Sequence, residues 1–302
     1  MRGFGLRLDV PAGLATVIGS LPLLPAAESS RIMRELVPDL VAAPTVDVAR
    51  GDGADRSDSL DVFSDFVREM SGRVEPIVVS LTGPVTVLLD LRREGRGARD
   101  AHVAARAAVR ERGEEMLQVT REHMPAAEVL MVLDEPGLAN SMHPTFPLDE
   151  DEVQELVGEV VHDLSPGAAV GVRVDGRADW SMLLRTGIAV LGAPVTAQLE
   201  TAAAELARFL ERGGVVAWGA VPTDEPLGTS ADRLWRRLSA LWCELVGEGI
   251  DPRLLRERSI ITTAGELSSF GTSQAERAIA LAQDLASRVF RQARGLHLSI
   301  GA

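Results

Sequence analysis

Two adjacent carboxylates end an uninterrupted apolar run near the middle of the chain. Residues 129–133 read VLMVL and are followed directly by Asp134 and Glu135. An unbroken aliphatic run of this length is typical of a strand that is buried on both faces of a parallel sheet. Ligands bind at the carboxyl ends of such strands, so both carboxylates are candidates for acid–base catalysis. The alternative is structural, with Asp134 capping the next segment or pairing with an arginine.

The same unit, a short apolar run followed by an amphipathic stretch, recurs along the chain. The predicted strands are residues 14–18, 40–43, 77–81, 129–133, 169–174, 188–191, 215–218 and 259–261. The predicted helices are residues 27–36, 59–70, 101–123, 150–164, 180–186, 197–212, 231–247 and 273–294. Eight alternating units in one chain favour a single (β/α)8 TIM barrel over an open doubly wound sheet. No linker-like segment divides the sequence, so we expect residues 1–302 to form one domain.

Polar residues follow most of these predicted strands. The strand exits carry Gly19 and Ser20, the loop 51–58 with Asp55, residues 82–84, Asp134 and Glu135, Asp175, Pro194, residues 222–225 and residues 262–266. Converging carboxylates suit a divalent cation, a ligand ammonium group, or acid–base work by a carboxyl of raised pKa. Alternatively, several of them pair with Arg56, Arg173 and Arg177, which belong to the same loops.

Composition excludes several classes of partner. The chain has 302 residues, 46% of them hydrophobic, and a formal net charge of -13. An acidic surface disfavours nucleic acid and anionic membranes. No apolar stretch reaches the roughly 18 residues that span a bilayer, and the N-terminus lacks a signal-peptide core. We therefore expect a soluble, cytoplasmic protein; the sequence does not indicate its oligomeric state.

Other chemical motifs are absent from the sequence. There is no GxGxxG after a strand, no Walker loop, no HExxH and no GxSxG. Among the histidines, only His143, in the loop after Asp134, could reach a site at the strand exits. The single cysteine, Cys243, falls within the apolar helical pattern of residues 234–245, which predicts a core thiol.

Four short stretches together resemble the C-terminal barrel of cobalamin-independent methionine synthase, in the superfamily that includes uroporphyrinogen decarboxylase. They are residues 16–22 (TVIGSLP), 55–63 (DRSDSLDVF), 81–86 (LTGPVT) and 133–138 (LDEPGL). The resemblance implies a methyltransferase of methionine biosynthesis with an amino-acid-like ligand. It places Gly19 and Ser20 on the ligand carboxylate, and Asp55 and Asp134 on its ammonium group.

The zinc ligands of that family are not present in this sequence. Arg173 and Asp175 stand where its histidine and first cysteine would be, Gly265 replaces the second cysteine, and residues 192–195 contain no carboxylate. Asp90 occupies the position of the tryptophan that stacks on folate. The resemblance therefore implies no bound metal and no cofactor.

Three functional classes remain open on this basis. The first is a methyltransferase of the methionine-synthase type. The second is a zinc-free enzyme of the same superfamily, with Asp134, Glu135 or Asp175 as acid–base groups. The third is a non-catalytic, amino-acid-binding or regulatory barrel.

Overall fold

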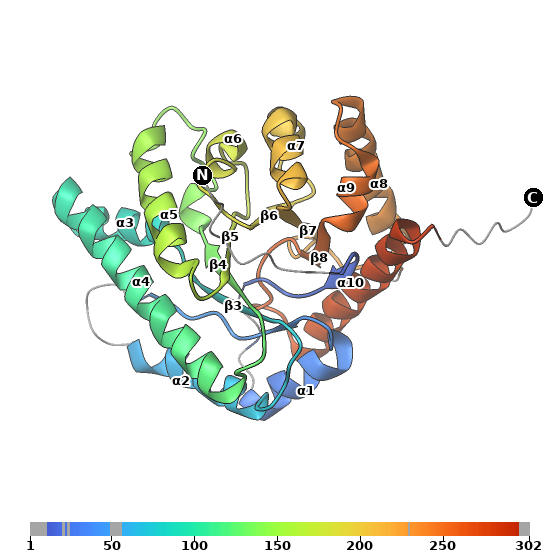
Figure 1. The fold of residues 1–302 in the computed structure, drawn as a ribbon, viewed down its shortest axis with the longest axis horizontal. Coiled ribbons are helices and arrows are strands. Elements are labelled where there is room, and N and C mark those ends of the chain that lie inside the picture. Colours follow the sequence, from blue (N-terminus) through green and yellow to red (C-terminus); the bar gives the residue numbers. More distant parts are fainter. Residues whose placement is uncertain (1–10, 20–21, 23–24, 49–55, 229, 296–302) are drawn as a thin grey trace, which may run out of the picture.

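Parallel strands curl into one sheet with helices around its outside in the computed structural model (Figure 1). The structure describes residues 11–19, 22, 25–48, 56–228 and 230–295. The strand order is β1-β8-β7-β6-β5-β4-β3-β2, with every hydrogen-bonded neighbour parallel. The predicted (β/α)8 barrel is confirmed.

The strands have the following bounds. They are β1 Leu14–Ala15, β2 Val41–Ala42, β3 Ile77–Thr82, β4 Val129–Asp134, β5 Ala169–Arg173, β6 Val190–Pro194, β7 Val215–Val221 and β8 Ser259–Thr263. The α-helices are α1 Ala26–Leu36, α2 Arg56–Glu69, α3 Pro84–Arg93, α4 Ala98–His123, α5 Glu150–Leu164, α6 Trp180–Leu183, α7 Ala203–Glu211, α8 Asp232–Gly247, α9 Pro252–Glu257 and α10 Thr272–Ala293. Two 3₁₀ turns, Pro136–Leu138 and Leu199–Ala202, follow β4 and β6.

Two helices were not expected from the sequence. Helix α3 begins directly after β3, where the Gly83-Pro84 pair had been taken only as a strand exit. Pro84 occupies the first helical position, where its missing N–H costs nothing and its fixed φ suits the helix. Helix α9 is a single short segment that leads into β8.

Strand register places the side chains of Thr82, Asp134 and Arg173 on one face. Thr82 pairs with Asp134, and Asp134 pairs with Arg173. Paired residues of neighbouring parallel strands point to the same side of the sheet. The polar ends of β3, β4 and β5 therefore lie next to one another at the carboxyl end of the barrel, which we call the barrel mouth.

The layers around the strands are held together by apolar packing. Every residue of β4, β5, β6, β7 and β8 is buried. Trp218 of β7 points outward, because its ring lies 6.2 Å from that of Trp242 on α8. Among the described residues, no helix has the length and hydropathy of a membrane span.

Candidate functional site

A buried arginine joins two carboxylates at the barrel mouth. Arg173 Nη1 donates to Asp134 Oδ1 and Oδ2 at 3.1 and 3.0 Å, and its Nη2 donates to Asp175 Oδ1. The side chains of Arg173 and Asp134 are 2% and 8% exposed, whereas that of Asp175 is 36% exposed. The sequence had offered two roles for these carboxylates, catalysis or pairing with an arginine, and the structure shows the pairing with Arg173.

Burial perturbs the acidity of both carboxyl groups. Loss of solvent raises the pKa of Asp134 to about 6, although the Arg173 guanidinium acts in the opposite direction. The neighbouring charges of Asp175, Glu266 and Asp47 add to the increase. Burial likewise raises the pKa of Asp175. Two carboxylates contact the Arg173 guanidinium, and the charges of Glu266 and Asp47 act on Asp134 as well, so the site disfavours anions and Asp134 retains a proton more readily than an isolated aspartate would.

Glycines allow other strand ends to approach this ion pair. Gly19 has φ +107, and a Cβ there would lie 2.6 Å from Arg173 Nη1 and 3.3 Å from Glu266 Cγ. At Gly192 of β6, a Cβ would lie 3.0 Å from the Cβ of Arg173. Two other residues predicted to bind substrate, Ser20 and Asp55, lie outside the described residues. The structure thus brings Gly19, Asp134 and Asp175 together and adds Arg173 and Glu266 to them.

Thr262, which belongs to the strand exit 262–266 expected from the sequence, is a polar residue of the barrel interior. Ser259 of the same strand faces outward, where its Oγ accepts from Trp218 Nε1 at 2.7 Å and donates to the Leu255 carbonyl of α9. Thr262, three residues later, lies on the opposite face in register with Gly219. It is 2% exposed, and its Oγ1 has no hydrogen-bond partner among the described residues. Such a group is available to a ligand or a bound water.

The Glu135 carboxyl group accepts hydrogen bonds from the first turn of helix α3. Its Oε1 accepts from the Val85 backbone N–H at 2.8 Å, and its Oε2 accepts from the N–H and hydroxyl of Thr86 at 2.8 and 2.7 Å. Helix α3 has no side-chain cap of its own and no acid in its first turn, so Glu135 supplies the missing acceptor. Burial raises the pKa of Glu135 to about 7, while these three hydrogen bonds lower it.

Two other sequence candidates lie apart from the ion pair. His143 Nδ1 forms a hydrogen bond with the hydroxyl of exposed Thr145 at 2.8 Å. Glu225, after β7, pairs with Arg237 and Arg233, and the Arg237 hydrogen bond holds its pKa below the usual value. These contacts leave the acids after β4 and β5 as the candidate site.

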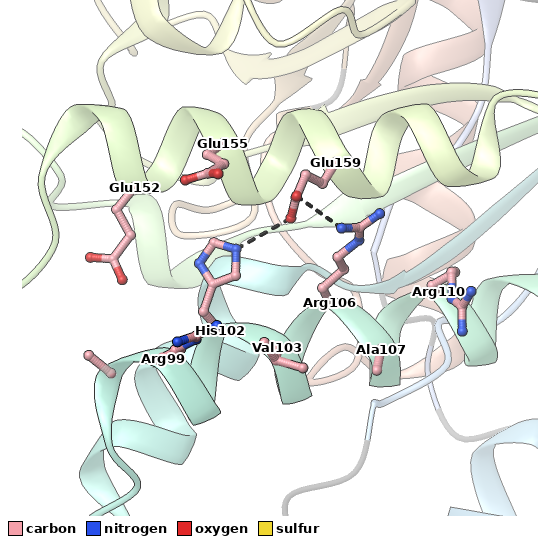
Figure 2. Close-up of a pocket in the computed structure, with 10 residues that line it drawn as sticks. Arg99, His102, Val103, Arg106, Ala107, Arg110, Glu152, Glu155 and Glu159 are labelled. Carbon is pink, nitrogen blue, oxygen red and sulfur yellow. Dashed lines mark hydrogen bonds and ion pairs between the residues drawn. The ribbon is translucent and has the colours of Figure 1, made fainter.

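A sizeable cavity among the described residues lies away from the barrel mouth. It measures about 580 Å³ and is an open groove between α4 and α5, shown in Figure 2. Within it, Glu159 faces both His102 and Arg106, at 3.3 and 2.9 Å. A smaller cavity of about 160 Å³ lies at the exits of β6, β7 and β8 and includes Gly219 and Asp224. We take the barrel mouth, and not these cavities, as the candidate functional site, because Asp134 and Asp175, whose pKa values are raised, lie there.

No group of three or more potential ligand side chains in the described ranges is arranged to hold a metal ion. The acids at the mouth are instead associated with Arg173. Its guanidinium contacts Asp134 and Asp175 directly, so these two carboxylates already have a counter-charge.

Comparison with known proteins supports the fold. Neither a family model nor a curated protein matches the sequence. A broad-specificity GH5-4 endoglucanase from Bacteroides salanitronis aligns at 11% identity over 96% of this chain and 97% of its own, with a TM-score of 0.54. ZgEngAGH5_4, solved in complex with a cellotriose, aligns at 12% identity over 95% and 99%, with a TM-score of 0.52.

A third structure is longer than this chain. It is the modular endo-β-1,4-mannanase of Cellulomonas fimi, at 16% identity with a TM-score of 0.48. This chain spans 65% of that protein's length, and the alignment covers 83% of this chain.

These findings overturn the methionine-synthase resemblance. The similar structures with a TM-score above 0.5 named above are glycoside hydrolases, and no family model supports a methionine-synthase-like barrel. The predicted family is therefore wrong, as are the methyltransferase function and its zinc-free or amino-acid-binding alternatives. A physical reason is visible in two of the motifs: LTGPVT and LDEPGL meet through Glu135 and Thr86, which fasten α3 to β4. These two motifs form the contact between the end of one strand and the start of a helix, so they do not identify a ligand.

Proposed function

We propose that the barrel mouth is the active site of a hydrolase for a neutral, hydroxyl-rich small molecule, with an oligosaccharide as the first candidate. The observation that carries this proposal is the Asp134 carboxyl, buried against Arg173 with a pKa of about 6. A carboxyl that keeps its proton near neutral pH suits general acid catalysis, in which a leaving oxygen must be protonated.

The two aspartates have different environments and so receive different roles. Asp134 is the more buried and is proposed as the general acid. Asp175 is 36% exposed beside the same guanidinium and is proposed as the ionised partner, a base or a nucleophile. Hydrolysis of a glycosidic bond uses such a pair of carboxyl groups. Glu135 is bonded to the start of α3 and is proposed to position the β4 exit; a direct catalytic role for it stays a prediction.

The charge at the mouth favours this class of ligand. Carboxylates outnumber the single Arg173 guanidinium, so an anionic substrate would be repelled while hydroxyl groups could donate to free carboxylate oxygens. The Thr262 hydroxyl, which is unpartnered among the described residues, is available to a ligand hydroxyl. Ser20 and Asp55, which follow β1 and β2 in the sequence, remain predicted lining residues. Cellotriose, the ligand named for one glycoside hydrolase of the same fold, is a reasonable first ligand to test.

The test is a hydrolysis assay with a matched pair of variants. Purified protein is incubated with β-linked oligosaccharides and aryl glycosides, and the released reducing ends or phenols are measured. Asp134→Asn should lower kcat by roughly 10²–10⁴-fold, the range for loss of a general acid. Asp163→Asn is the control, because Asp163 also accepts two hydrogen bonds from an arginine, Arg106, but on the outer helices.

Two results would refute the proposal. One is the absence of both turnover and calorimetric binding across the panel. The other is an Asp134→Asn variant that hydrolyses a substrate as fast as the wild type. In either case Asp134, Arg173 and Asp175 are better explained as a structural ion pair that joins β4 to β5.

A further inference from the structure

A second cavity, of about 330 Å³, lies on the outside of the barrel between α8, α9 and the end of α10. Helix α9 leads into the first residue of β8, so this cavity lies toward the end of the barrel opposite the mouth. Its size falls within the range of small-molecule sites. The hydrolase proposed above makes no use of it.

The walls of this cavity are aromatic. Trp235 and Trp242, both from α8, pack edge to face with ring centres 6.1 Å apart, and Leu255 and Val246 complete the apolar lining. Val246 is 38% exposed and adds accessible apolar surface to this wall. Trp242 is 7% exposed, and its Nε1 has no hydrogen-bond partner among the described residues. The walls thus offer aromatic and aliphatic surface to a ligand.

The rim carries one cation without a counter-ion. Arg256 of α9 lines the cavity and forms no ion pair with any described residue. Arg253, three residues earlier on the same helix, pairs with Glu257 at 2.8 Å. In a chain of net charge -13, carboxylates are plentiful, yet none neutralises Arg256 in the described structure. An anionic group of a ligand would do so, through the two-pronged geometry that suits guanidinium.

We propose that this cavity binds a small aromatic carboxylate. The ring would pack on Trp235 and Trp242, and the carboxylate would accept hydrogen bonds from Arg256. Aromatic stacking and a charge-assisted hydrogen bond together define the class, since a neutral ring uses only the first and an aliphatic acid only the second. The cavity is separate from the mouth, so this proposal does not depend on the hydrolase.

Calorimetric titration with 2-naphthoate tests the proposal. We expect one saturable site per chain and weaker binding of the neutral analogue 2-naphthalenemethanol. Arg256→Gln should weaken 2-naphthoate binding about ten- to a hundredfold, as expected for one charge-assisted hydrogen bond. Arg253→Gln is the control on the same helix and should leave the affinity unchanged.

Cys243 provides a second measurement at the same cavity. It is the single cysteine of the chain, it is exposed, and it belongs to the cavity lining. Bound 2-naphthoate should slow alkylation of its thiol by iodoacetamide severalfold in the wild type and have little effect in Arg256→Gln. Unprotected Cys243 under saturating ligand would overturn the proposal. So would equal affinity of the wild type and Arg256→Gln, or tighter binding of the neutral analogue.

Discussion

Replacing Glu135 by glutamine changes the hydrogen bonds that join helix α3 to the end of strand β4. In the wild type, two carboxylate oxygens accept three hydrogen bonds, from the N–H of Val85 and from the N–H and hydroxyl of Thr86. Glutamine offers one carbonyl oxygen and one NH2 group. At least one donor from α3 would then face another donor in a fully buried environment.

The cost of Glu135→Gln follows from this mismatch. A buried donor without a partner costs about 1–3 kcal/mol. Near pH 5 the wild-type carboxyl is largely uncharged, because its folded-state pKa is about 7, so the variant exchanges one neutral group for another. We therefore expect Glu135→Gln to lower the free energy of unfolding at this pH by about 1–3 kcal/mol. Relaxation is restricted on one side, because a Cβ at Gly83 would already lie 2.3 Å from the Glu135 Cδ.

Urea unfolding followed by circular dichroism measures this loss. Glu150→Gln serves as the control, because Glu150 has a side chain 53% exposed and its surface pair with Arg185 should contribute little. If the free energy of unfolding of Glu135→Gln lies within about 0.5 kcal/mol of the wild-type value, Glu135 does not stabilise the contact between α3 and β4, because one buried donor without a partner already costs about 1 kcal/mol.

The pH dependence of this effect has a defined sign. The folded-state pKa of Glu135, about 7, lies above its ordinary value of 4.5. A raised pKa means that the carboxyl contributes stability that is complete below pH 4.5 and is lost as the pH rises through about 7. The free energy of unfolding of Glu135→Gln should accordingly depend less on pH across this window than that of the wild type.

Three further predictions concern the barrel mouth. Asp134 has a folded-state pKa of about 6 against an ordinary 3.8, so its contribution to stability should be complete below pH 3.8 and be lost as the pH rises through 6. In Asp134→Asn the free energy of unfolding in urea should therefore depend less on pH across that range. If Asp134 is the general acid, kcat should fall as the pH rises through about 6 in a pH–rate profile. Arg173→Gln should destabilise the fold by about 3–5 kcal/mol in the same unfolding assay, more at pH 8 than at pH 5, because Asp134 and Asp175 lose their buried counter-charge.

The fold was predictable because the signal for it repeats along the chain. Buried strands such as residues 129–133 have no polar alternation, and amphipathic helices follow them, so eight units indicated a barrel before any contact was known. Helix α3 escaped detection, because Gly83-Pro84 marks a strand exit and a helix start equally well. Cys243 was misplaced for a related reason: the apolar pattern of residues 234–245 identified the buried face of α8, and the thiol lies outside it.

The site was only partly predictable. The sequence placed Asp134 and Asp175 at strand exits, since the carboxyl ends of parallel strands meet at one edge. Whether these carboxylates act in catalysis or pair with an arginine could not be predicted, because the direction of the Arg173 side chain depends on the register of β4 with β5. The mistaken family followed from the same ambiguity, since short turn motifs have similar chemistry in different barrels.

The sequence by itself determined the barrel and the placement of Asp134 and Asp175 at the ends of its strands. Tertiary structure decided what those acids contact. Burial gave Asp134 its raised pKa, strand register brought Arg173 to it, and packing of α3 committed Glu135 to backbone N–H groups. The physical reason is distance along the chain. Hydrophobic periodicity is local, whereas pKa values and hydrogen-bond partners depend on groups 39 to 50 residues apart that only the folded barrel brings together.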